Sequence, residues 1–103
     1  MSAKAPSAVL DEFRDAIRAT MTQFGVSEAG VFGSTARGSD RVGSDLDLIV
    51  EFVPGERRDV IRLSDALSDL TGLHVDVVDH QAVRSRAAKT GIGSSILRDT
   101  VPL

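Results

Sequence analysis

The stretch Gly30–Phe52, GVFGSTARGSDRVGSDLDLIVEF, determines how the rest of this chain is organised. It begins with a short apolar run that ends at Gly33-Ser34, and ten residues further on it reaches Asp45-Leu46-Asp47. Apolar runs bounded by glycine predict strands, and polar residues between them predict turns and loops. A strand, a Gly-Ser turn and a second strand with two acids therefore form the centre of the predicted fold.

The Gly33-Ser34 turn has features of an anion site. Residues 29–32 predict a buried strand, and Ser34 stands at a favourable helix N-cap position with residues 35–37 as a first helical turn. Backbone N–H groups at a helix start favour an anion, and Gly33 lacks a Cβ that would keep a phosphate away. A strand, turn and helix cap without a ligand would have the same pattern, so the turn alone does not establish a phosphate site.

The second strand carries a pair of acids. Residues 44–52 alternate so that Asp45 and Asp47 share one face and the apolar residues share the other. Two adjacent carboxylates repel each other, which raises a pKa or requires a cation between them. Mg²⁺ prefers oxygen ligands and needs few of them from the protein. An edge strand with two solvated acids would show the same alternation.

A third acid lies in a later predicted strand, residues 73–79. Asp76 stands among β-branched apolar residues there, where an acid is costly unless it is paired, protonated or bound to metal. If this strand lies beside the first, Asp76 completes a cluster of three carboxylates. Asp45 and Asp47 would then hold metal ions, and Asp76 would bind one ion and activate an attacking hydroxyl. We interpret Asp79 as a turn residue at the strand end.

The combined pattern resembles a known signature. Gly33-Ser34, ten residues, and Asp45-x-Asp47, with Ala36-Arg37-Gly38 between them and Ser44 before the pair, resemble the nucleotidyltransferase signature of the DNA polymerase β superfamily. The chain is most similar to the minimal nucleotidyltransferase (MNT) family, the antitoxin partners of HEPN-domain toxins, over nearly its whole length. The resemblance implies an α/β (α+β) nucleotidyltransferase fold, with helices on a small mixed β-sheet that places Asp76 next to the Asp pair.

The resemblance also implies an activity. Family members of this kind transfer an adenylyl group (AMP) from Mg-ATP to a hydroxyl, here expected to be a tyrosine of a cognate HEPN toxin, which neutralises the toxin. Mg²⁺ is the implied cofactor, ATP the substrate and the toxin the partner. By the same resemblance, the nucleotide-binding residues are Gly33, Ser34, Arg37 and Ser44, and the catalytic metal ligands are Asp45, Asp47 and Asp76.

Other functions fit the sequence less well. One alternative is an antitoxin that neutralises by contact alone, but the three acids and the Gly-Ser turn of an active site are all present. Another is transfer to a small molecule, which requires a further domain that a chain of this size has no room for. A P-loop is excluded because no lysine follows Gly38, and no Gly-x-Gly-x-x-Gly motif indicates a dinucleotide fold.

Composition limits the remaining possibilities. A chain of 103 residues predicts one domain, residues 1–103. The net charge of -3 and the presence of only four aromatic residues, all Phe, argue against direct nucleic-acid binding. The absence of cysteine is typical of a reducing compartment, and no apolar run has the length of a membrane span. We therefore predict a cytoplasmic protein that has no membrane segment.

The segments on either side of the central motif are expected to form helices that pack against it. Residues 1–6 are expected to form a loose end, a helix is expected from Ser7 to about Gly25, and a second from Glu56 to Leu70. Their apolar stripes, expected to be buried, are Leu10, Phe13, Ile17 and Met21 in the first helix and Val60, Leu63, Leu67 and Leu70 in the second.

The C-terminal tail, residues 82–103, is a candidate partner-docking segment. A basic run in its first part predicts a solvated helix face, and Gly91 and Gly93 predict a break in that helix. The two histidines, His74 and His80, flank the Asp76 strand without a second histidine at ligand spacing. We interpret both as structural or surface residues.

Overall fold

The computed structural model describes residues 4–91 and 94–103, with backbone only for residues 94 and 95. It contains one four-stranded sheet in the order β3-β2-β1-β4. In chain order the elements are α1 (Pro6–Gln23), β1 (Val26–Phe32), α2 (Gly33–Arg37), β2 (Leu46–Phe52), α3 (Val60–Thr71), β3 (Val75–Asp79), α4 (His80–Thr90), α5 (Ser94–Asp99) and β4 (Val101–Pro102). Because β1 is antiparallel to β2 and β4 while β2 and β3 are parallel, the sheet is mixed, which confirms the predicted fold class.

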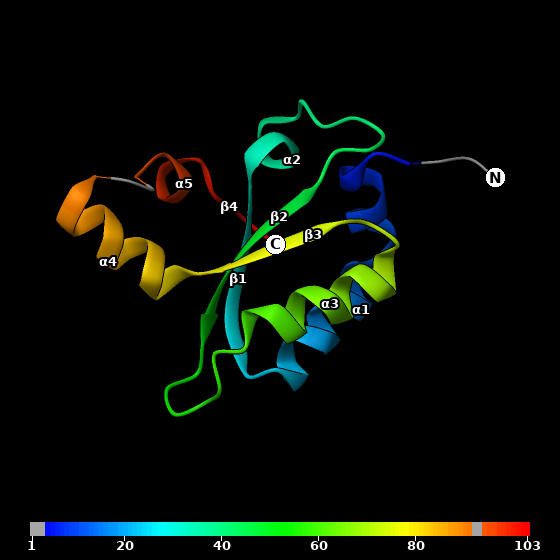
Figure 1. Cartoon of the computed structure of the whole chain (residues 1–103). Coiled ribbons are helices and arrows are strands. Elements are labelled where there is room, and N and C mark those ends of the chain that lie inside the picture. The colour runs from blue at the N-terminus through cyan, green and yellow to red at the C-terminus, as the bar shows by residue number, and fades with distance from the viewer. Residues whose placement is uncertain (1–3, 92–93) are drawn as a thin grey trace.

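Helices α1 and α3 lie together on one face of the sheet (Figure 1). Successive side chains of a strand point to opposite faces, so alternate residues of β2 and β3 reach this covered face. The buried core consists of Leu10, Ile17, Met21, Val31, Leu46, Leu48, Val50, Phe52, Leu63, Leu67, Val75, Val77 and Leu103. Five residues of the two predicted helical stripes belong to this core, and Phe13, Val60 and Leu70 pack against it while partly buried. Asp47 of β2 and Asp76 of β3 fall on the other face.

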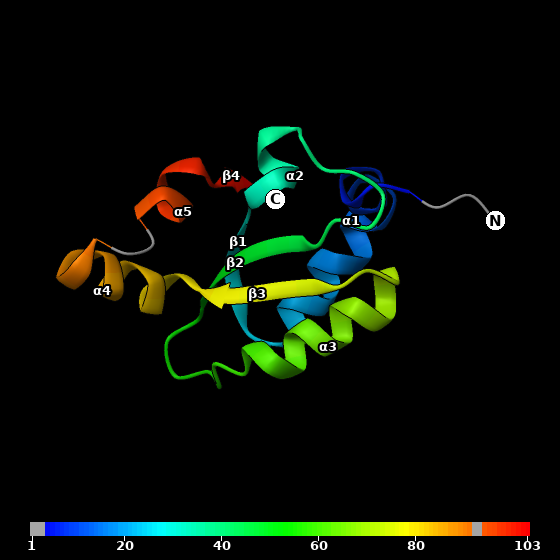
Figure 2. The same ribbon diagram turned by 45° about the horizontal axis from the view of Figure 1, so that its top comes forward.

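The other face is covered only in part. Figure 2 shows α2 and α5 on the opposite side of the sheet from α3. These two short helices contact each other, and α4 contacts the ends of β2 and β3. The uncovered part is where the strands carry their acids. No helix in residues 4–91 or 94–103 has the length and apolar character needed to cross a bilayer.

Helix starts differ from the predicted ones for identifiable reasons. The second long helix begins at Val60 instead of Glu56, because the Asp59 carboxylate caps it by accepting the Arg62 N–H at 3.1 Å. The short helix begins at Gly33, so Ser34 lies inside its first turn and is not its N-cap. The first helix begins at Pro6, which is buried, and residues 1–3 of the expected loose end lie outside the described part.

The tail is fastened to the first helix and to the edge of the sheet. The guanidinium groups of Arg14 and Arg18 donate hydrogen bonds of 2.9 and 2.8 Å to the Leu103 carbonyl. A Cβ on Gly30 would come within 2.5 Å of the Thr100 Cγ2, so the tail lies directly on β1 there. The predicted helix break is confirmed at Gly91, the left-handed C-cap of α4, whereas Gly93 lies outside the described residues.

The α3 helix allows a matched test of the core. Leu63 is fully buried, whereas Ile61 on the same helix is 72% exposed. We expect Leu63→Ala to lower the free energy of unfolding by about 2–5 kcal/mol because it leaves a cavity. Ile61→Ala is expected to change it by no more than about 0.5 kcal/mol, as at other exposed sites. Urea unfolding of both variants measures the difference, and similar losses would contradict this packing of α3.

Candidate functional site

Four ionisable side chains share one corner of the uncovered face. In the parallel pairing of β2 and β3, Asp47 lies opposite Asp76. One step earlier, the Leu46 N–H donates to the His74 carbonyl at 3.0 Å, which brings His74 beside Asp45. The His74 Nδ1 stands 3.2 Å from the Asp45 Oδ1. We call these four residues, Asp45, Asp47, His74 and Asp76, the acidic corner.

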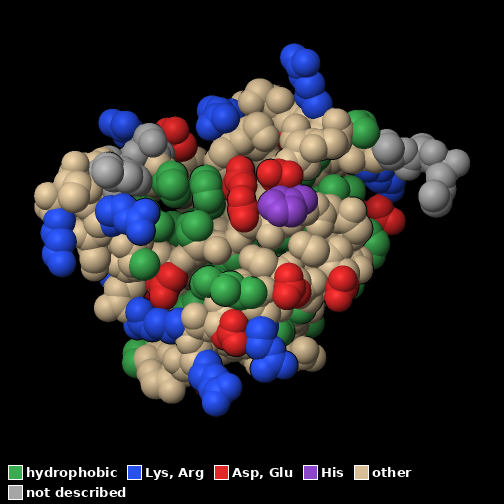
Figure 3. All heavy atoms as spheres, viewed as in Figure 1, with side chains coloured by type: hydrophobic (Ala, Val, Ile, Leu, Met, Phe, Trp, Pro, Cys, Tyr) green, Lys and Arg blue, Asp and Glu red, His purple; other side chains and the backbone are tan. Residues whose placement is uncertain are grey.

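Three members of the acidic corner are placed to share an ion. Each of Asp45, His74 and Asp76 offers one ligand atom, and these atoms all lie within 4.8 Å of one another. All three side chains are exposed, and Figure 3 shows acidic side chains beside a histidine at the molecular surface. The burial cost that we expected for Asp76 therefore does not arise, because strand alternation turns it away from the core.

Asp47 is the member that is not part of this trio. It is half-buried, and its Oδ2 would lie 2.3 Å from a Cβ placed on Gly33. The structure thus gives the glycine a role that sequence reasoning did not foresee. Gly33 has φ of +73° and leaves room for a carboxylate of the protein itself.

The surroundings of Asp47 make its ionised form unfavourable. Partial burial raises the pKa of Asp47 above its ordinary value, and the charges of Asp76 and Asp45 raise this pKa further. His74 and Arg37 act on the pKa in the opposite direction. Of the predicted nucleotide-binding residues, Arg37 is therefore close enough to influence Asp47 electrostatically.

The loop between α2 and β2 is held at two points. The Ser44 hydroxyl accepts the Arg41 N–H at 3.0 Å, which closes the loop just before Asp45. The Asp40 carboxylate accepts the Ser7 N–H at 2.8 Å, and this hydrogen bond holds the pKa of Asp40 below its ordinary value. Asp40 thereby caps α1, whose own N-cap residue offers no side-chain acceptor.

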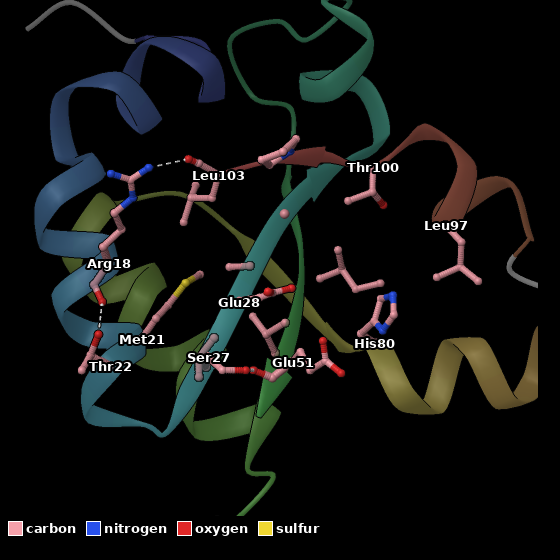
Figure 4. A pocket seen from close by; sticks show the side chains of 16 residues that line it. Arg18, Met21, Thr22, Ser27, Glu28, Glu51, His80, Leu97, Thr100 and Leu103 are labelled. Atoms are coloured by element: carbon pink, nitrogen blue, oxygen red, sulfur yellow. Dashed lines mark hydrogen bonds between the residues drawn. The ribbon is translucent and has the colours of Figure 1, made fainter. Parts of the chain in front are cut away.

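A cavity of about 770 Å³ lies elsewhere, between α1, the edge of β1 and the tail. Figure 4 shows His80, Leu97 and Thr100 on one side of it and Arg18 on the other, with Glu28 and Glu51 between them. No member of the acidic corner is among its lining residues. The cavity and the acidic corner are therefore separate features of the structure.

Comparison with known proteins identifies the family. The family model of the nucleotidyltransferase domain matches residues 10–102. The protein adenylyltransferase MntA of Thermococcus cleftensis is 41% identical over 81 residues, which cover 77% of this chain and 76% of that protein. The chain belongs to the nucleotidyltransferase family.

Solved structures agree with this assignment. A structure described as a minimal nucleotidyltransferase matches with a TM-score of 0.73 and 37% identity over 94% of this chain and 95% of that one. Two toxin–antitoxin structures share the fold. One, with AMP-PNP, has a TM-score of 0.66 at 21% identity over 85% of this chain and 69% of that one. The other, of MntA and HpeT, has a TM-score of 0.63 at 20% identity, and the match covers 87% of this chain and 70% of that one.

The acidic corner of this nucleotidyltransferase suits a divalent cation. Carboxylate oxygens are the preferred ligands of Mg²⁺, and imidazole nitrogen is a ligand for transition ions. Sequence reasoning found the three acids but placed His74 outside the site. The available signal was its position two residues before Asp76, because residues two apart in a strand share a face.

The contact between Gly33 and Asp47 can be tested with two alanine variants. Gly33 and Gly38 both have φ of +73°, but nothing lies within 4 Å of a Cβ on Gly38. Gly38→Ala should therefore lower the free energy of unfolding by about 1–2 kcal/mol, the cost of left-handed backbone. Gly33→Ala should lose clearly more, because its methyl group also displaces the carboxylate. Equal losses in chemical unfolding would show that the Asp47 contact is unimportant.

The raised pKa of Asp47 predicts a pH-dependent effect on stability. Since the ionised carboxylate is unfavourable in the folded protein, we expect Asp47→Asn to melt at a higher temperature than wild type at neutral pH. The difference should shrink as the pH falls through the raised pKa towards the ordinary aspartate value, where wild type becomes protonated as well. Melting curves across this range measure the difference, and a less stable variant at neutral pH would contradict the prediction.

Proposed function

We propose that this nucleotidyltransferase transfers AMP from Mg-ATP to a hydroxyl of a partner protein, the HEPN toxin of a toxin–antitoxin pair. The observation that carries the proposal is the acidic corner, where three carboxylates gather on an uncovered sheet face and Asp47 lies against Gly33. A protein adenylyltransferase at 41% identity and toxin–antitoxin structures of the same fold support the choice of acceptor.

Each residue of the site has a proposed role. Gly33 and Ser34, at the start of α2, would bind the triphosphate through backbone N–H groups. Arg37, whose charge already acts on Asp47, would pair with a phosphate. Ser44 would act indirectly, because its hydroxyl closes the loop that leads into Asp45. The carboxylates of Asp45, Asp47 and Asp76 would hold the metal.

The proposed reaction is a displacement at the α-phosphorus of ATP. The acceptor hydroxyl oxygen forms a bond to this phosphorus, the bond to the bridging oxygen of the β-phosphate breaks, and pyrophosphate leaves. Asp76 takes the hydroxyl proton, for which its exposed position on edge strand β3 leaves access. Bound Mg²⁺ would supply positive charge for the phosphate oxygens.

The exposed position of the acidic corner supports a protein acceptor. The cavity between β1 and the tail has the volume of a small-molecule pocket, yet no acid of the corner is among its lining residues. An acceptor hydroxyl has to reach the exposed corner, which a side chain projecting from a docked protein can do. We propose the tail, residues 82–103, as part of the surface on which that partner docks.

Thermal melting tests the nucleotide site first. We expect Mg-ATP to stabilise wild type by roughly 2.7 kcal/mol at a hundredfold excess over Kd. ATP without Mg²⁺ should stabilise it less, and the double variant Asp45→Asn/Asp47→Asn should not respond to magnesium. Glu28→Gln, a single substitution at an exposed acid of β1 on the same sheet, is a charge control and should respond like wild type. No shift with any nucleotide would contradict a site that works without its partner.

The acceptor is tested by incubating the protein with its cognate toxin and ATP labelled at the α-phosphate. We expect label on a tyrosine of the toxin, identified by mass spectrometry, and loss of toxin activity. Asp76→Asn should bind the toxin without labelling it. If this variant neutralises the toxin as well as wild type does, contact alone is sufficient and the transferase role is refuted.

A further inference from the structure

We propose that His74 is a metal ligand and that it makes the acidic corner selective for first-row transition ions over Mg²⁺ before nucleotide binds. This inference rests on the proposed function, in which Mg²⁺ arrives with ATP and the acids hold metal. It adds a nitrogen donor to a site otherwise made of oxygen donors. The class of ligand is a divalent transition ion that accepts imidazole.

Strand pairing places His74 in the site. His74 immediately precedes β3 and lies two residues before Asp76, so the strand alternation places both side chains on the uncovered face. The hydrogen bond from the Leu46 N–H to the His74 carbonyl fixes the register, so the imidazole stands beside Asp45. The position of His74 is therefore a consequence of backbone pairing and does not depend on the side-chain rotamer alone.

The donor spacing agrees with shared coordination. Two atoms bound to one ion at roughly 2.0–2.2 Å are roughly 2.8–3.6 Å apart in octahedral or tetrahedral geometry. The His74 Nδ1 and the Asp45 Oδ1 are 3.2 Å apart, and the Asp76 donor lies within 4.8 Å of both. An ion can enter between the first two atoms with little movement, and the exposed Asp76 can rotate towards it.

The donor types decide which ion is favoured. Magnesium is bound through oxygen, whereas imidazole increases affinity for ions such as Co²⁺ and Zn²⁺. The chain contains no cysteine and only two histidines, so His74 is the main source of selectivity available to this corner. The other histidine, His80, lies at the cavity between β1 and the tail.

A nucleotide-free titration with Co²⁺ tests the proposal through its visible absorption. We expect wild type and the matched control His80→Ala to bind Co²⁺ alike. His74→Ala should bind it at least about tenfold more weakly, since even indirect partners of metal ligands change affinity that much. The His74 side chain is 69% exposed, so this variant should keep its fold, which circular dichroism checks.

Nitrogen NMR with Zn²⁺ gives a second readout that is independent of activity. Zinc should shift the imidazole nitrogens of His74 and leave those of His80 in place. Co²⁺ binding that is equally tight in wild type and His74→Ala, or a zinc-induced shift at His80 alone, would overturn the proposal. Because neither experiment contains nucleotide, this failure is distinct from that of the proposed function, which the Mg-ATP melting shift of the wild type reports.

Discussion

The parallel pairing of β2 with β3 is the constraint on which the rest of the structure depends. It places Asp47 opposite Asp76, an arrangement of like charges that destabilises a sheet when nothing binds there. The compensation lies on the opposite face of the same two strands, where Leu46, Leu48 and Val77 are buried under α1 and α3. Hydrophobic burial on the covered face thus holds the two strands together although the carboxylates on the other face repel each other. A cation bound there can relieve that repulsion.

Much of this arrangement could be predicted from local patterns. Alternation in β2 separates acids from core residues, and the helical stripe of α1 identifies its buried side. The grouping of Asp45, Asp47 and Asp76 followed from the family resemblance, which implied that the two strands lie side by side. The Gly-Ser turn was recognisable because an apolar run ends at a glycine, and Gly33 does adopt a positive φ in the structure.

The features that were missed depend on contacts between distant residues. The capping of α1 by Asp40 joins residues 33 positions apart, which no local pattern shows. The start of α3 was misplaced because a turn and the Asp59 cap replace its first expected helical residues. His74 was excluded on sequence spacing between histidines, whereas its relevant neighbour, Asp45, is on another strand.

Both edge strands of the sheet have features that discourage self-association. Strand β4 is two residues long, and it carries Pro102, which has no N–H to offer another strand. At the other edge, β3 exposes the charge of Asp76. Short, proline-containing or charged edges discourage the edge-to-edge pairing that leads to aggregation. The acid proposed for catalysis therefore also helps to keep copies of this small sheet from joining one another.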